Sequence, residues 1–178
     1  YERARHFYEA AAEQGDVMAI CNLGRLYEDG RGVDRDYSKA IEYYQQAAAE
    51  GNAIAQNSLG LCYFTGNGIE QDYKQAFFYC KQAAEQGLDV AQENIAYFYN
   101  NGYGIELDEE QAYIWYEKAA LQGIGNAQYC LGRFYELGTG ARQQDYKQAA
   151  VYYEQAAEQG HAEACYKLSR LYYKGHGV

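Results

Sequence analysis

The sequence repeats itself with a period of about 36 residues, and this repetition restricts the chain to an array of equivalent structural units. Glycine occupies two equivalent places in each copy, and both rows of glycines advance in steps of 36, 36, 36 and 37 residues. The rows are Gly15, Gly51, Gly87, Gly123, Gly160 and Gly30, Gly66, Gly102, Gly138, Gly175. Periods of about 20 to 50 residues are typical of solenoids, whose units pack only against their neighbours.

The first pattern in each copy predicts a helix, which we call helix A. It reads Ala-x3-Leu-Gly-x2-Tyr, for example from Ala55 to Tyr63, and this spacing places the named side chains on one helix face. Glycine inside a helix is unfavourable by roughly 1 kcal/mol relative to alanine, yet only Ala96 and Ser169 replace it. We therefore expect a neighbouring helix to approach closely at this position, and we expect Ser169 to be buried.

The second pattern predicts a helix that we call helix B. It follows an aspartate in four copies, namely Asp36, Asp72, Asp108 and Asp145. Aspartate accepts hydrogen bonds from the free N–H groups of a first helical turn, and the glycine after the helix readily adopts the left-handed conformation that ends it. A stripe of small and aromatic residues, such as Ala40, Tyr44 and Ala47, predicts the buried face. Most of the 22 tyrosines occupy recurrent positions of this kind.

The two patterns alternate along the whole chain and predict ten helices in an all-α solenoid of about five helix-turn-helix repeats. The predicted single domain covers residues 1–178. It comprises a half repeat over 1–15, repeats over 16–51, 52–87, 88–123 and 124–160, and a half repeat over 161–178. Because the array starts and stops within a repeat, and because the first residue is Tyr1 rather than Met, we expect a fragment of a longer array.

Composition narrows the classes of partner. The net charge is -10, and an acidic surface repels phosphate backbones, so we expect no nucleic acid partner. No apolar run approaches the roughly 18 residues that a membrane span needs, so we expect no membrane span. Cytoplasmic, periplasmic and secreted locations all remain open.

Residues suited to metal binding or catalysis are scattered through the copies. The five cysteines form no CxxC motif and favour core packing over a metal site. They are Cys21, Cys62, Cys80, Cys130 and Cys165. His6, His161 and His176 are predicted to lie far apart in the array, and no G-x-S-x-G motif occurs. The Gly-x-Gly loops lack a preceding strand and a third glycine, which favours a turn over a phosphate site. We predict no cofactor, no metal and no enzyme.

The pattern A-x3-L-G-x2-Y-x2-G-x-G-V-x2-D-Y-x-K-A-x2-Y-Y-x2-A-A-x2-G resembles the Sel-1-like repeat, a relative of the tetratricopeptide repeat. The resemblance covers essentially the whole chain. Departures are Ala96 and Ser169 at the glycine position, Glu109 in place of Tyr37, and Ala141 with a one-residue insertion.

The resemblance implies a right-handed α/α superhelix that acts as an adaptor. Members of the family typically bind other proteins in bacterial signalling, envelope assembly, host interaction and eukaryotic protein quality control. Some cysteine-rich relatives bridge their helices through two regularly spaced cysteines per repeat. This regular cysteine spacing is absent from the present sequence, so we expect no such disulfides.

A superhelix of this type predicts a groove lined by helix A, on the face opposite its Leu-Gly-Tyr stripe. Residues on this face vary between copies while the stripe stays constant, as expected if the stripe forms the scaffold and the face selects a partner. Tyrosine and arginine are favoured binding anchors. The predicted partner-binding residues of this concave face are Arg25, Asn57, Leu61, Phe64, Glu93, Tyr97, Tyr129, Arg133, Tyr166 and Arg170.

These observations predict a non-catalytic scaffold that holds an extended segment or loop of a partner protein or peptide, with carboxylate groups on the arginines. The alternative for the arginines is pairing with glutamates on the same wall, for example Glu28, Glu93 and Glu136. An alternative function is a regulatory or immunity-type inhibitor of a partner enzyme. A third is hydrolysis of β-lactams, as some relatives are labelled, but no nucleophile, base and oxyanion donor can be named here.

Overall fold

The computed structural model describes residues 1–177, and within them all regular structure is α-helical. The ten helices are α1 (Glu2–Ala12), α2 (Val17–Asp29), α3 (Tyr37–Ala49), α4 (Ala53–Thr65), α5 (Tyr73–Glu85), α6 (Asp89–Asn101), α7 (Glu109–Leu121), α8 (Gly125–Leu137), α9 (Tyr146–Glu158) and α10 (Ala162–Lys174). Even-numbered helices correspond to helix A and odd-numbered helices to helix B. The predicted all-α repeat solenoid with ten helices is confirmed.

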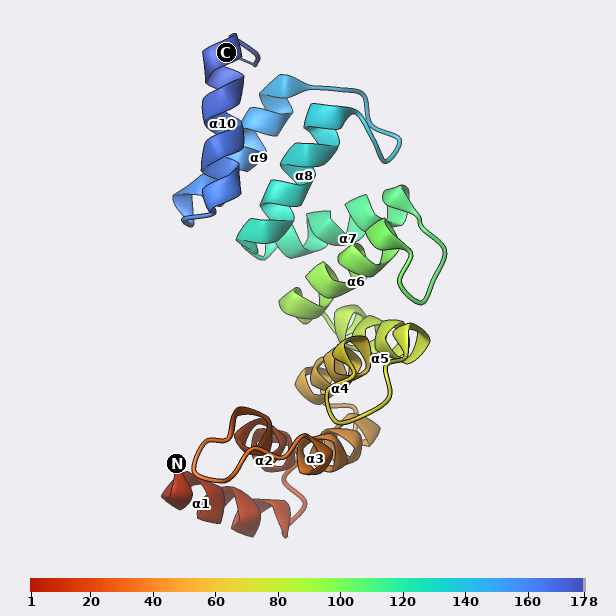
Figure 1. The fold of residues 1–178 in the computed structure, drawn as a ribbon, viewed down its shortest axis with the longest axis vertical. Coiled ribbons are helices and arrows are strands. Elements are labelled where there is room, and N and C mark those ends of the chain that lie inside the picture. Colours follow the sequence, from red (N-terminus) through yellow and green to blue (C-terminus); the bar gives the residue numbers. More distant parts are fainter. Residues whose placement is uncertain (178) are drawn as a thin grey trace. The chain divides into compact units, whose positions relative to one another are not determined.

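The chain divides into two compact units, Tyr1–Ala91 and Gln92–Val178, with the boundary inside α6. In unit 1, α2 packs beside α3 and α4 packs beside α5 (Figure 1). In unit 2, α9 packs against both α8 and α10 (Figure 1). Within each unit, helices that follow one another along the chain therefore pack together as helical hairpins.

Side-chain caps fix the starts of seven helices: α2, α3, α4, α5, α7, α9 and α10. The four predicted aspartates accept hydrogen bonds from first-turn N–H groups at the starts of α3, α5, α7 and α9, as expected. Asp16, Asn52 and His161 do the same for α2, α4 and α10. In contrast, α1 follows Tyr1 and α8 follows Ile124, and neither helix has a side-chain cap.

The glycine within helix A lies where helix B comes closest. A Cβ atom on Gly60 would lie 2.5 Å from Sγ of Cys80, and one on Gly132 would lie 2.6 Å from the ring of Tyr153. Real Cβ atoms do not tolerate such distances, so the predicted close approach is confirmed. The prediction that Ser169 is buried is wrong. In the other copies the following helix covers this position, and within residues 1–177 no helix follows α10. The Ser169 hydroxyl is exposed and donates to the carbonyl oxygen of Tyr166 at 2.8 Å.

Each unit contains a fully buried tyrosine of helix B that donates to a glutamate at the end of helix A. The Tyr44 hydroxyl lies 2.5 Å from Oε2 of Glu28, and the Tyr153 hydroxyl lies 2.6 Å from Oε2 of Glu136. Burial, followed by the hydrogen bond to glutamate, raises the pKa of both phenols, so they remain donors. A buried hydroxyl without a partner would cost about 1–3 kcal/mol, and the glutamates remove that penalty.

Glutamine pairs join neighbouring helices, a feature that the sequence analysis missed. The Gln86 amide donates to Oε1 of Gln56 at 2.7 Å, and Gln56 in turn donates to the Ala48 carbonyl oxygen at 3.3 Å, so Gln56 connects three helices. Gln159 and Gln128 repeat the first of these contacts in unit 2 at 2.8 Å. The signal was present in the sequence, since these glutamines recur at the same repeat positions.

Candidate functional site

In unit 1, the predicted partner-binding residues differ in how much surface they present. Arg25 of α2 is exposed, whereas Leu61 and Phe64 of α4 are half-buried. The Phe64 ring lies 5.5 Å from the ring of Tyr73. Asn57 is only 7% exposed and therefore offers little surface to a partner.

In unit 2, four predicted residues lie on exposed parts of helix A. Tyr97 of α6 is 42% exposed and Tyr166 of α10 is 62% exposed, while Arg133 of α8 and Arg170 of α10 are also exposed. The Arg170 guanidinium lies 5.9 Å from the centre of the Tyr166 ring. The exposed surface of α10 thus combines an aromatic ring with a cation, a pairing that favours protein contacts.

The other two predicted residues of unit 2 are engaged by neighbouring side chains. Tyr129 is half-buried, and its ring stacks on His161 with 4.5 Å between ring centres. Nδ1 of His161 accepts the Ala164 N–H at 3.2 Å and so caps α10. Glu93 accepts a hydrogen bond from the side chain of Asn126. Tyr129 and Glu93 therefore contribute to the packing of unit 2 whether or not a partner is bound.

The exposed arginines do not pair with the glutamates that the sequence offers. Glu28 accepts a hydrogen bond from a tyrosine, Glu136 accepts from a tyrosine and a lysine, and Glu93 accepts from an asparagine. Within residues 1–177, the three arginines predicted for the concave face, Arg25, Arg133 and Arg170, form no ion pair within 4.0 Å. None of the three is held by a direct ion pair, although the positive charge of Arg170 still acts on the Glu136 carboxylate.

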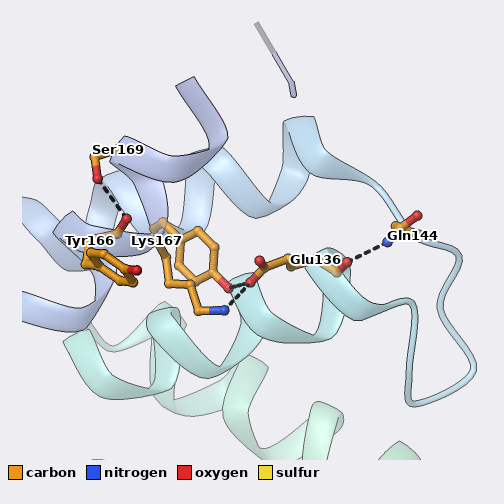
Figure 2. A network of polar contacts seen from close by, with 6 residues as sticks. Glu136, Gln144, Tyr166, Lys167 and Ser169 are labelled. Carbon is orange, nitrogen blue, oxygen red and sulfur yellow. Dashed lines mark hydrogen bonds and ion pairs between the residues drawn. The ribbon is translucent and has the colours of Figure 1, made fainter. Parts of the chain in front are cut away.

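A lysine that the sequence analysis did not single out connects α10 to α8. Nζ of Lys167 lies 2.8 Å from Oε2 of Glu136, the same atom that accepts the Tyr153 hydroxyl (Figure 2). Gln144, in the loop after α8, donates to the Glu136 carbonyl oxygen at 2.8 Å. Burial raises the pKa of Glu136, but the hydrogen bonds from Lys167 and Tyr153 outweigh burial, and the net effect lowers the pKa. The carboxylate is therefore charged at neutral pH and holds Lys167 beside α8.

A cavity of about 150 Å³ lies among α6, α7 and α8, and Arg133 lines it. Other lining residues are Phe134, Leu137 and Glu109. The Glu109 carboxylate already accepts the Gly140 backbone N–H at 3.0 Å. The thiol of Cys130 also lines this cavity, and burial raises its pKa to about 11, so it remains protonated at neutral pH. The cavity therefore combines the apolar side chains of Phe134 and Leu137 with one positive and one negative group, Arg133 and Glu109.

Unit 1 contains an equivalent cavity of about 210 Å³ between α1 and α2. Its residues occupy the same repeat positions, three repeats earlier, so that Arg25 corresponds to Arg133. Asp29 and Arg31 take the places of Leu137 and Thr139, and they form an ion pair at 3.0 Å. Each cavity therefore contains one carboxylate: Asp29 in unit 1 pairs with Arg31, and Glu109 in unit 2 accepts the Gly140 N–H.

The cysteines are all free thiols, and Cys21, Cys62 and Cys80 are buried as expected. Burial raises the pKa of both Cys62 and Cys80 to about 12. Cys165 is exposed, which differs from the predicted core packing. In residues 1–177, no three histidine, cysteine, aspartate or glutamate side chains gather where they could hold a metal ion. Every described helix falls short of the length and apolar character that crossing a membrane requires.

Helical hairpins with a constant core and variable exposed faces define a helical-repeat protein. The sequence profile of the Sel1 repeat matches residues 1–16, 17–52, 53–88, 89–124, 125–161 and 162–178. The chain therefore belongs to the Sel1 repeat family, as its sequence pattern predicted. Proteins of this family are generally non-catalytic scaffolds for protein interactions.

Solved structures of the same family are similar over nearly the whole chain. A protective antigen of uropathogenic Escherichia coli with an SLR fold is 36% identical, with a TM-score of 0.94 over 98% of this chain, which spans 37% of that protein. A Sel1 repeat protein from Oxalobacter formigenes is 34% identical, with a TM-score of 0.89 over 98% of this chain and 71% of its own. An immunity protein from Pseudomonas aeruginosa is 26% identical, with a TM-score of 0.60 over 94% of this chain and 61% of its own. Among curated proteins, none matches this chain in sequence.

Proposed function

We propose that this chain is a binding scaffold whose exposed helix A residues contact a partner polypeptide. The observation that carries the proposal is the set of exposed arginines and tyrosines on helix A, whose guanidinium groups form no ion pair within the described residues. In unit 2 these are Tyr97, Arg133, Tyr166 and Arg170. Such side chains supply contact area and charged hydrogen bonds once a partner removes water from them.

The division between core and surface supports the same conclusion. The buried tyrosines Tyr44 and Tyr153 occupy equivalent places and make equivalent hydrogen bonds in the two units. At exposed positions of helix A the residues differ, with Leu61 in α4 where Arg133 stands in α8. A constant interior with a changing surface is how repeat proteins present extended binding surfaces.

A site-specific photocrosslinking experiment tests the proposal. The photoreactive amino acid p-benzoylphenylalanine replaces Tyr166 on α10 in one variant and Val151 on α9 in the matched control. Both positions are exposed, at 62% and 46%. We expect one discrete crosslinked protein of reproducible mass from position 166 and a much weaker product from position 151. Equal crosslinking from both positions, or crosslinking from position 151 alone, would contradict the proposed face.

The alternative role, inhibition of a partner enzyme, has one specific observation in its favour. An immunity protein of Pseudomonas aeruginosa is similar to this chain over 94% of its residues. If the crosslinked partner is an enzyme that co-purifies in a one-to-one complex and loses activity when this protein is added, the inhibitor role is correct. A partner that keeps its activity, or a complex of several proteins, indicates a scaffold instead.

A further inference from the structure

We infer that the cavity among α6, α7 and α8 binds a neutral carboxamide group, carried by a glutamine or asparagine side chain of the partner. The inference rests on the proposed function and adds the chemistry of one contact. It assigns that contact to unit 2 and not to the equivalent cavity in unit 1.

Two opposite charges line this cavity without pairing with each other. No nitrogen of Arg133 lies within 4.0 Å of a carboxylate oxygen of Glu109. A hydrogen bond between such groups needs about 2.9 Å, so the two side chains do not satisfy each other directly. Glu109 accepts the Gly140 N–H through Oε2 and forms no ion pair within residues 1–177. An occupant can therefore accept from the guanidinium and donate to the carboxylate.

A carboxamide performs both functions without a net charge. Its oxygen accepts hydrogen bonds and its NH₂ group donates them through a second atom. A carboxylate in the same place could not donate to Glu109, and an ammonium group could not accept from Arg133. The helices α7 and α8 carry four acidic and two basic side chains, which disfavours an anion further. A neutral group that both donates and accepts is thus the best complement to this lining.

The size and the walls of the cavity suit one short side chain. Its volume of about 150 Å³ is smaller than the ~300–1,000 Å³ typical of sites for small molecules. Phe134 and Leu137 provide apolar surface against which the methylene groups of a glutamine can pack. Asn100 adds an amide of its own to the lining, while Tyr116 and Cys130 form a hydrogen bond with each other.

The equivalent cavity in unit 1 is a matched control that the chain itself provides. Arg25 occupies the place of Arg133, but Tyr1 stands where Glu109 stands in unit 2. The lining carboxylate, Asp29, is already bound to Arg31 at 3.0 Å. The NH₂ group of an amide would find that acceptor engaged, so the carboxamide selects the cavity in unit 2.

Nuclear magnetic resonance titrations with small probes test this chemistry. Propionamide represents the glutamine side chain. Its counterparts are N,N-dimethylpropionamide, which lacks N–H donors, the anion propionate and the cation propylammonium. The readout is the backbone N–H resonance of Gly140, which is bonded to Glu109. We expect propionamide to shift this resonance saturably and to bind about tenfold more tightly than each counterpart, because each counterpart loses one hydrogen bond to a charged group.

Two arginine variants locate the site and connect it to the partner. Arg133→Met should weaken propionamide binding about tenfold, and Arg25→Met should leave it unchanged. In the photocrosslinking experiment, Arg133→Met should likewise reduce the product from position 166 about tenfold, whereas Arg25→Met should not. An unchanged yield for Arg133→Met would overturn the assignment of this cavity to the partner. Circular dichroism verifies that both variants retain the helical fold.

Three titration results would overturn the inference. One is binding of propionate or propylammonium as tight as that of propionamide, which would show that charge selects the occupant. Another is equal weakening of propionamide binding by Arg25→Met and Arg133→Met. The third is no saturable shift with propionamide, which would indicate a cavity filled by water alone. If a discrete protein still crosslinks from position 166 in that case, the proposed scaffold function stands and only the carboxamide chemistry is wrong.

Discussion

The cavity between α1 and α2 and the cavity among α6, α7 and α8 occupy equivalent positions three repeats apart, but they use charge differently. The first contains an internal ion pair between Asp29 and Arg31 at 3.0 Å. The second has Leu137 and Thr139 at those two positions, and its Arg133 forms no ion pair within residues 1–177. Equivalent backbone positions can therefore carry either an ion pair, as Asp29 and Arg31 do, or uncharged side chains, as Leu137 and Thr139 do.

The hydrogen bonds between buried tyrosines and glutamates also differ slightly between the two units. Tyr44 and Tyr153 bind Glu28 and Glu136 in almost the same geometry. In unit 2 a third group, Lys167, binds the same carboxylate, and among residues 1–177 Glu28 has no such ion pair. The core interaction is conserved between the units of this chain, while its surroundings differ.

The largest effect should come from removing the buried rings. Tyr44→Ala and Tyr153→Ala should each reduce the free energy of unfolding by about 3–5 kcal/mol, because each leaves a cavity in place of a fully buried aromatic side chain. Urea unfolding followed by far-ultraviolet circular dichroism measures both. If one substitution costs less than half as much as the other, the two positions are not energetically equivalent.

Removing only the hydroxyl groups should reduce the free energy of unfolding by different amounts in the two units. Tyr44→Phe leaves Glu28 without its tyrosine donor and should cost about 1–2 kcal/mol. Tyr153→Phe should cost less, under about 1 kcal/mol, because Lys167 continues to bind Glu136. The same urea titrations apply. A larger loss for Tyr153→Phe would show that Lys167 does not compensate for the lost bond.

The ion pair between Lys167 and Glu136 in unit 2 should contribute to the free energy of unfolding in a pH-dependent way. Lys167→Met should reduce the free energy of unfolding by about 1 kcal/mol at pH 7. The pKa of Glu136 is lowered in the folded protein, so its stabilisation is present above the unfolded pKa of about 4.3. This stabilisation is lost as the pH falls through the pKa that Glu136 has in the folded protein, which is lower than its unfolded pKa. The difference between variant and parent should therefore disappear near pH 2–3, and a constant difference would point to lost packing of the lysine stem.

The smallest effect concerns the arginines that distinguish the two cavities. Arg25→Gln and Arg133→Gln should each change the free energy of unfolding by no more than about 0.5 kcal/mol, since both side chains are exposed and form no ion pair within residues 1–177. Thermal unfolding is sufficient for this comparison. A loss above about 1 kcal/mol for Arg133→Gln would assign it a structural role and weaken the case for a binding residue.

Much of the fold could be predicted because its requirements are local. Asp72 caps the start of α5 because a carboxylate before a helix meets free N–H groups in the same turn. Gly60 predicted a close helix contact because its recurrence outweighs its low helix propensity. The burial of Ser169 was predicted wrongly, because it depends on a neighbouring helix and not on the residue itself.

The candidate site was less predictable, because it depends on contacts between distant residues. Lys167 and Glu136 are 31 positions apart and meet only when α10 packs near α8. The availability of Arg133 and Arg170 depends on which side chains occupy the nearby glutamates, and the sequence left both outcomes open. Asn57 met the same positional rule as the exposed residues, yet packing leaves it 7% exposed.

The sequence by itself determined the repeat, the alternation of two helix types, their caps and the membership of the Sel1 repeat family. Each of these depends on residue type at a fixed spacing, so no tertiary contact is needed to recognise it. Tertiary structure alone decided which charges are neutralised, because ion pairs and hydrogen bonds form between side chains of different helices at distances near 3 Å. The contrast between Arg133 and the Asp29–Arg31 pair follows from that geometry.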